Sequence, residues 1–126
     1  MKYLAKRCLF MSRHDPKVTL QQLITYAQRA QLLCMNRTLD ELLADWQTTW
    51  TFERVMQLLG EAVKRLPREL CNRYPAVDWK AIAGMRNNIT HGYDSIDYEI
   101  LWKAVQTQVP GLLVTLNQML NDLKEQ

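Results

Sequence analysis

The chain has 126 residues and a formal net charge of +3, with 48% hydrophobic residues, 23% charged residues, four Gly and four Pro. This length suits one domain over residues 1–126, and the composition excludes a fibrous or disordered protein. Charged residues interrupt every apolar run, which excludes a membrane-spanning helix. The three cysteines form no CxxC pair, which excludes a zinc ribbon, and we expect a soluble cytoplasmic protein.

The amino terminus is expected to contribute little. Its first residues, MKYLAKRCLF, have too few apolar residues for a secretory signal peptide, and we expect residues 1–11 to form a flexible extension. Asp15 followed by Pro16 predicts the start of the first helix, because aspartate caps helices and proline suits their first position. Apolar residues then recur every three or four positions, which predicts a helix ending near Asn36.

Two further helices are expected in the middle of the chain. Thr38 and Glu41 have the spacing of a capping box and predict a short helix. The threonine-rich segment at residues 46–51 is expected to bend it. The clearest amphipathic pattern covers residues 52–66 and predicts a long helix that Pro67 stops.

A turn separates the next two elements. We expect a short helical segment at residues 69–73 and then a turn at Tyr74 and Pro75, because the residue before proline is pushed out of helical geometry. Asp78 is a good N-cap for the following helix. Gly92 suits the left-handed conformation that closes a helix.

The last element is predicted to be one long helix. It starts at Ser95 or Asp97, and its apolar stripe keeps phase across Pro110, which predicts a proline kink. No segment shows the two-residue alternation of a strand. The sequence therefore predicts an all-α protein, an antiparallel bundle of four or five helices.

Basic residues are clustered in two parts of the chain, residues 1–20 and residues 64–86. Residues 64–86 carry six basic and two acidic side chains. Such a cluster suits either a phosphate-facing surface or a solvated helix face. If Lys64, Arg65 and Arg68 follow an RNA backbone, the affinity for RNA should fall steeply as the salt concentration rises. The six basic residues are Lys64, Arg65, Arg68, Arg73, Lys80 and Arg86.

The segment MRNNITHGY, residues 85–93, is the one plausible home for chemistry. It gathers a cation, two amides, an imidazole and a phenol. Neither His91 nor the other histidine, His14, has a partner at ligand spacing, so we expect no metal site. The sequence also lacks a phosphate-binding glycine-rich loop and a serine-nucleophile motif, which excludes those enzyme classes.

Arg86 and His91 together suit phosphoryl chemistry on RNA. Arginine stays charged and presents a planar fork of donors to phosphate oxygens, whereas histidine titrates near neutrality and exchanges protons. The 2′-hydroxyl of RNA is an internal nucleophile. Cleavage could therefore proceed to a cyclic phosphate without a metal ion.

The spacing of the motif raises a question of geometry. Residues five apart on an ideal helix lie about 140° apart around its axis, whereas Asn87 and His91 share a face. Either the helix unwinds over residues 90–92, or two copies of the motif meet across a two-fold axis. A homodimer answers the geometry better and would also use surplus apolar surface such as Trp46 and Trp50.

These residues carry a resemblance to a known family. The pattern Arg86-x4-His91-x-Tyr93, inside IAGMRNNITHGYDSIDYEILWKAV, resembles the signature of HEPN ribonuclease toxins of the HepT type. LLGEAVKRLPREL, RYPAVDW, the Asp-Pro at the first helix and the proline in the last helix agree with it. The resemblance covers about residues 12–123, essentially the whole domain.

The resemblance implies a homodimeric, metal-independent endoribonuclease without a cofactor, with Arg86 and His91 in the catalytic positions and Asn87 in the polar position beside the arginine. It implies the toxin of a type VII-like toxin–antitoxin system. The implied antitoxin is an MntA-like minimal nucleotidyltransferase that uses ATP to transfer AMP to Tyr93. The implied substrate is RNA, including tRNA.

Other interpretations remain open from the sequence. The chain could be a non-catalytic helical subunit that binds a nucleotidyltransferase partner and its nucleotide or substrate. Arg86 could merely pair with Asp94 or Glu61, His91 could interact with the carbonyls of its helix end, and Tyr93 could anchor a loop. A DNA-binding helix-turn-helix is disfavoured, because no basic recognition helix stands out.

Overall fold

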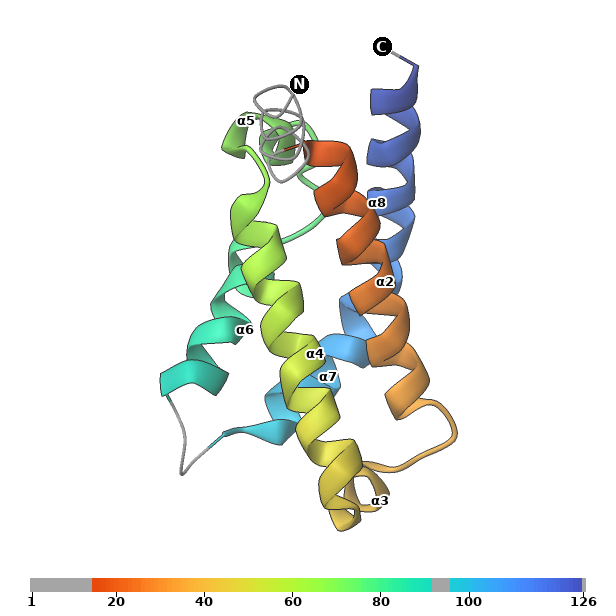
Figure 1. Cartoon of the computed structure of the whole chain (residues 1–126), viewed down its shortest axis with the longest axis vertical. Coiled ribbons are helices and arrows are strands. Elements are labelled where there is room, and N and C mark those ends of the chain that lie inside the picture. Colours follow the sequence, from red (N-terminus) through yellow and green to blue (C-terminus); the bar gives the residue numbers. More distant parts are fainter. Residues whose placement is uncertain (1–14, 92–95, 126) are drawn as a thin grey trace, which may run out of the picture.

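The computed structural model describes residues 15–91 and 96–125, with the side chains of Thr90 and His91 excepted. Within these ranges the chain forms seven helices and no strand, which confirms the all-α prediction. Five helices have ten or more residues, and two are short (Figure 1). They are α2 (Pro16–Cys34), α3 (Leu39–Ala44), α4 (Trp46–Arg65), α5 (Arg68–Asn72), α6 (Trp79–His91), α7 (Tyr98–Thr107) and α8 (Val109–Lys124).

Local hydrogen bonds start most of these helices where the sequence predicts. The Asp15 side chain accepts from the Lys17 N–H at 2.9 Å, and Pro16 takes the first position of α2. Thr38 and Glu41 form the reciprocal bonds of the capping box. Each cap satisfies N–H groups that have no partner inside the helix. The predicted extension at residues 1–11 lies outside the described residues.

The prediction that the threonine-rich segment bends the second helix is wrong, because these residues form the first turns of α4. The chain breaks one residue earlier, at Asp45, whose side chain accepts from the Thr48 N–H. The Thr49 hydroxyl is buried and lies within hydrogen-bonding distance of the carbonyls of Leu42 (2.9 Å) and Asp45 (3.0 Å). The threonines therefore stabilise the junction between α3 and α4.

The prediction of one kinked final helix is wrong, because α7 and α8 are separate helices that meet at Gln108. Pro110 stands in the first turn of α8. Proline has no N–H and its ring clashes with the carbonyl four residues earlier, so it begins a helix more easily than it continues one. The start of α7 at the Asp97 cap is as predicted, whereas Ser95 lies outside the described residues.

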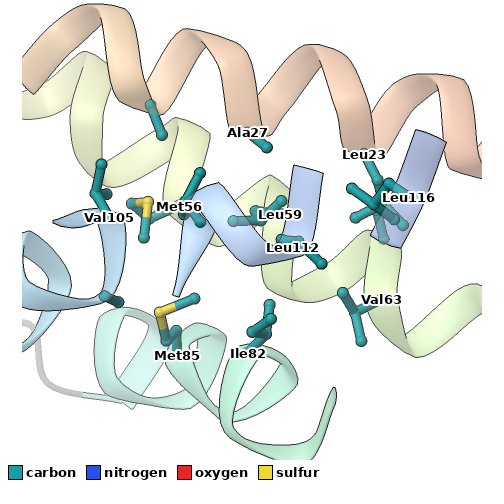
Figure 2. Close-up of a cluster of buried hydrophobic side chains, with 14 of the residues drawn as sticks. Leu23, Ala27, Met56, Leu59, Val63, Ile82, Met85, Val105, Leu112 and Leu116 are labelled. Atoms are coloured by element: carbon teal, nitrogen blue, oxygen red, sulfur yellow. The ribbon is translucent and has the colours of Figure 1, made fainter. Parts of the chain in front are cut away.

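Helix α4 lies at the centre of the bundle, with antiparallel neighbours α2 on one side and α6 on the other (Figure 1). Its apolar stripe is almost fully buried, and Phe52 and Met56 have no exposed surface. Figure 2 shows this stripe between side chains of the neighbouring helices. The residues labelled there are Leu23, Ala27, Met56, Leu59, Val63, Ile82, Met85, Val105, Leu112 and Leu116.

The position of α6 depends mainly on α4. Ile82 and Met85 are buried and point from α6 toward the core (Figure 2). Burying such side chains stabilises the fold by about 25 cal/mol for each Å² of apolar surface that is removed from water.

Among the helices that the structure describes, none is both long enough and apolar enough to cross a membrane.

Candidate functional site

Helix α6 carries the segment in which the sequence concentrates polar groups. It begins after Asp78, whose Oδ1 accepts from the Ala81 N–H at 3.1 Å, and this confirms the predicted N-cap. The backbone is helical through His91, so it does not unwind at Thr90 or His91. Gly92 and Tyr93 lie outside the described residues.

Arg86 lies where α6 crosses α4 at Gly60. A Cβ atom placed on Gly60 would lie 3.1 Å from the Cβ and the N of Arg86 and 3.1 Å from the carbonyl oxygen of Ile82. Two of these three atoms belong to the α6 backbone, which cannot rotate out of the way. The missing side chain of Gly60 therefore lets the backbone that carries Arg86 approach α4 closely.

The Arg86 side chain forms an ion pair with Glu61, the next residue on α4. The Nε atom lies 3.5 Å from Glu61 Oε1, and the two side chains are 35% and 30% exposed. Glu61 in turn accepts from Gln57 Nε2 at 3.3 Å. Exposed pairs of this kind add about 0–1 kcal/mol to stability, so this one serves mainly to orient the guanidinium.

This pairing confirms one of the two partners expected for Arg86, and the other, Asp94, lies outside the described residues. The contact is made at Nε. The guanidinium carries two further nitrogens, whose donors match two oxygens of a phosphate group. Arg86 is therefore anchored at one edge and partly open to solvent.

Four of the other predicted site residues are described by the structure, and all four are exposed. Asn87 is exposed on α6 directly after Arg86. Lys64 and Arg65 end α4, and Arg68 begins α5, and all three are exposed. Arg65 Nη2 donates to Gln22 Oε1 of α2 at 3.2 Å, on the other side of α4 from α6.

An open groove lies between the end of α4, α5 and the start of α6. Its volume is about 1230 Å³. Its lining includes Lys64 and Arg68 together with Lys80, but neither Arg65 nor Arg86. The sequence places Lys80 in the basic cluster, but only the packing of α6 beside α4 brings it to the same groove as Lys64. The full lining is Val63, Lys64, Leu66, Arg68, Cys71, Asn72, Pro75, Ala76, Val77, Asp78, Trp79, Lys80 and Ala83.

Two cysteines are buried and unsuited to nucleophilic chemistry. Burial raises the pKa of Cys34 to about 11 and also raises the pKa of Cys71. Both thiols are therefore protonated near neutral pH, and only a thiolate is a good nucleophile. In the part of the chain that the structure describes, no three His, Cys, Asp or Glu side chains gather in a way that would hold a metal ion.

Two tyrosines already use their hydroxyl groups inside the fold. Tyr98 donates to Glu53 of α4, and burial is the main cause that raises the pKa of Tyr98 to about 12. Tyr74 donates to Asp122 of α8, and this bond raises the pKa of Tyr74. Both phenols therefore stay neutral and bonded near neutral pH.

The close approach at Gly60 leads to a testable expectation. Gly60→Ala should displace α6 by a few tenths of an ångström and lower any activity that depends on Arg86 by about tenfold or more, since small misplacements of catalytic groups are costly. Alanine stabilises a helix by up to about 1 kcal/mol relative to glycine. The melting temperature should therefore fall less than the strain alone would cause. The measurement compares activity with thermal unfolding.

Gly111→Ala is the matched control, because a Cβ at Gly111 of α8 meets nothing within 4 Å. It makes the same exchange within a helix and should leave activity unchanged. Equal activity of Gly60→Ala and the native protein would show that the crossing tolerates a methyl group, and the positioning argument would fail.

Comparison with known proteins gives a consistent result. The family model described as ribonuclease HepT-like matches residues 23–119. A protein of Methanocaldococcus jannaschii named "Putative RNase" is 38% identical over 87 residues, which are 69% of this chain and 72% of that protein. A protein of Caldanaerobacter subterraneus with the same description is 34% identical over 85 residues, 68% of this chain and 76% of that protein.

A third relative bears the family's own name. A protein of Thermococcus cleftensis named "Probable ribonuclease HepT" is 32% identical over 73 residues, which are 58% of this chain and 66% of that protein. No solved structure matches this chain significantly. The matched residues 23–119 include both the α4–α6 crossing and the polar segment at the end of α6.

Proposed function

Since this chain belongs to the ribonuclease HepT-like family, we propose that it is a cytoplasmic endoribonuclease that cuts RNA without a metal ion. The observation that carries this proposal is the partly exposed Arg86 side chain. Glu61 of α4 holds this side chain by an ion pair, and Arg86 lies on the same helix, α6, as His91. Both residues lie within the stretch that the family model matches.

The proposed reaction uses only groups of this chain and of RNA. The 2′-oxygen attacks the adjacent phosphorus, the bond from phosphorus to the 5′-oxygen breaks, and the products are a 2′,3′-cyclic phosphate and a 5′-hydroxyl. His91 takes the proton of the 2′-hydroxyl and then gives it to the 5′-oxygen as that oxygen leaves. Arg86 binds the phosphate oxygens as negative charge develops, and the exposed amide of Asn87 adds a donor beside it.

A homodimer would bring these groups to one phosphate. Because α6 stays helical through His91, positions 86 and 91 lie about 140° apart around the same axis. Two copies of α6 that meet across a two-fold axis can present position 86 of one protomer beside position 91 of the other. The exposed rings of Trp46 and Trp50, with centroids 4.9 Å apart, offer apolar surface for such an assembly.

The composite site can be tested by mixing inactive variants. If each site takes arginine from one protomer and histidine from the other, mixed dimers of Arg86→Ala and His91→Ala contain one intact site. Random exchange of protomers should then restore about a quarter of the native activity. The control mixes either variant with itself under the same exchange conditions. Exchanged dimers that stay inactive would place both groups on one protomer.

We also propose that the chain is the toxin of a type VII-like pair, with an MntA-like nucleotidyltransferase as antitoxin. The phenol oxygen of Tyr93 would attack the α-phosphorus of ATP, and pyrophosphate would leave. The attached AMP would add bulk and negative charge two residues from His91, which disfavours a second phosphate. The hydroxyls of Tyr74 and Tyr98 are already engaged inside the fold, which disfavours these two tyrosines as acceptors.

The direct test is a cleavage assay with purified protein on total tRNA and on a short single-stranded RNA in excess EDTA. The expected result is cleavage that leaves cyclic phosphate ends. A folded native protein with unmodified Tyr93 that leaves both RNAs intact would overturn the proposal and favour a non-catalytic subunit. Cleavage that requires added metal would remove the metal-independent mechanism.

A further inference from the structure

The groove between α4, α5 and α6 is lined by exposed cations together with buried apolar residues. Lys64 of α4, Arg68 of α5 and Lys80 of α6 line the groove and are exposed. Val63 and Leu66 also line it and are buried. Proteins that bind single-stranded nucleic acid use this combination, with cations along the backbone and apolar or aromatic surface against the bases.

The positive charge of the groove is largely uncompensated. None of the three cations forms an ion pair within the part of the chain that the structure describes. The lining contains a single carboxylate, Asp78, and that group already accepts the Ala81 N–H at the start of α6. An anionic chain in the groove would therefore meet three cations and one committed carboxylate.

The groove also offers a rigid aromatic wall. Trp79 is half-buried, and its Nε1 donates to the carbonyl oxygen of Tyr74 at 3.0 Å. This bond fixes the indole at the first position of α6, so the ring needs little reordering when a base packs against it. The same bond leaves the indole no donor for phosphate, and its contribution would come from the ring surface.

The dimensions favour an extended chain over a single small molecule. The volume of this open groove, about 1230 Å³, exceeds the range of about 300–1,000 Å³ that is usual for small-ligand pockets. Ala83 belongs to the lining and lies one helical turn before Arg86. Lys80 and Arg86 are about 9 Å apart along the helix axis at 1.5 Å per residue.

We propose that this groove binds the single-stranded flank of the RNA whose phosphate is cut at Arg86. This inference rests on the proposed ribonuclease function and adds a substrate requirement to it. RNA that extends beyond the cleaved linkage binds more tightly, because Lys64, Arg68 and Lys80 contact its phosphates. A dinucleotide reaches the motif but not the groove.

The test separates binding from cleavage. Binding is measured by fluorescence anisotropy with a 2′-O-methyl RNA of about 12 nucleotides, which lacks the attacking hydroxyl. The double variant Lys64→Ala/Lys80→Ala removes one cation from each side of the groove. We expect Kd to rise about tenfold or more at low salt. The slope of log K against log[salt] should shrink by about 1.4, or 0.7 for each lost phosphate contact.

Arg29→Ala/Arg37→Ala is the matched control, since it removes the same charge from exposed positions in and after α2, outside the groove lining. It should bind the RNA as the native protein does. Cleavage of a dinucleotide should be unchanged in both double variants, because its single phosphate lies at the motif. Loss of RNA affinity in the groove variant alone supports the proposal.

The possible failures are distinguishable. If the native protein cleaves RNA but the two double variants bind it equally, the groove inference is wrong and the proposed function stands. If the native protein binds RNA through the groove but never cleaves, the proposed function fails and the groove remains an RNA site. If a poly-glutamate peptide with the same negative charge as the RNA displaces the RNA from the groove, the groove accepts acidic chains in general. The RNA assignment is then overturned.

Discussion

Arg86→Ala and His91→Ala should each abolish RNA cleavage in excess EDTA while leaving the protein folded. Loss of a general acid or base costs about 10²–10⁴ in rate, and loss of a donor to a developing negative charge costs about 10²–10³. The Arg86 side chain is partly exposed and its ion pair is weak, so stability should change by about 1 kcal/mol or less. Two quantities are measured for each variant, the rate of cyclic phosphate formation and the melting temperature.

Two controls make this result specific. Arg86→Lys keeps the charge but loses the planar fork, so it should recover only a small part of the activity. His14→Ala removes the other histidine of the chain and should cleave at the native rate. Native rates in Arg86→Ala and His91→Ala alike would point to a contaminating nuclease. A native rate in one alone would remove that residue from the mechanism.

Transfer of AMP to Tyr93 should silence the native protein completely, and Tyr93→Phe should stay active in the presence of the nucleotidyltransferase and ATP. Phenylalanine lacks only the oxygen that accepts AMP, so cleavage itself should be preserved. Tyr98→Phe is the control, since the Tyr98 hydroxyl is already donated to Glu53. That variant should still be modified and silenced. Intact mass and cleavage rate are measured on the same samples.

Two results would contradict the modification model. A native protein that carries AMP on Tyr93 but still cleaves RNA would show that the modification does not block the site. A Tyr93→Phe variant that the nucleotidyltransferase still silences, without any added mass, would show that binding of the partner is sufficient. Either result would leave the endoribonuclease assignment itself untouched.

The positions where helices start were largely predictable because their signals are local. Asp15, the pair Thr38 and Glu41, Asp78 and Asp97 each bond to an N–H within three residues, so a short stretch of sequence contains the whole interaction. Apolar spacing likewise identified the buried face of α4. The fold class and the helix that carries the motif follow from such short-range patterns.

The errors arose where two local signals compete. The apolar stripe continues across Pro110, which favours one helix, whereas the missing N–H of proline favours a new start. The structure resolves this with a break at Gln108. Threonines at the start of α4 similarly weaken a helix in isolation, but Thr49 bonds back to the carbonyl of Leu42 once α3 and α4 are placed together.

The sequence by itself determined the chemistry that is available, namely an arginine, an amide and a histidine near the end of one helix. Only the tertiary structure decided how the arginine is held, because Glu61 and Gly60 meet Arg86 across a helix crossing some 25 residues away in the chain. The same packing separates Arg65 from the groove that contains Lys64. Local hydrogen bonds start most of the helices, but the crossing of α4 and α6 holds Arg86 of the candidate site.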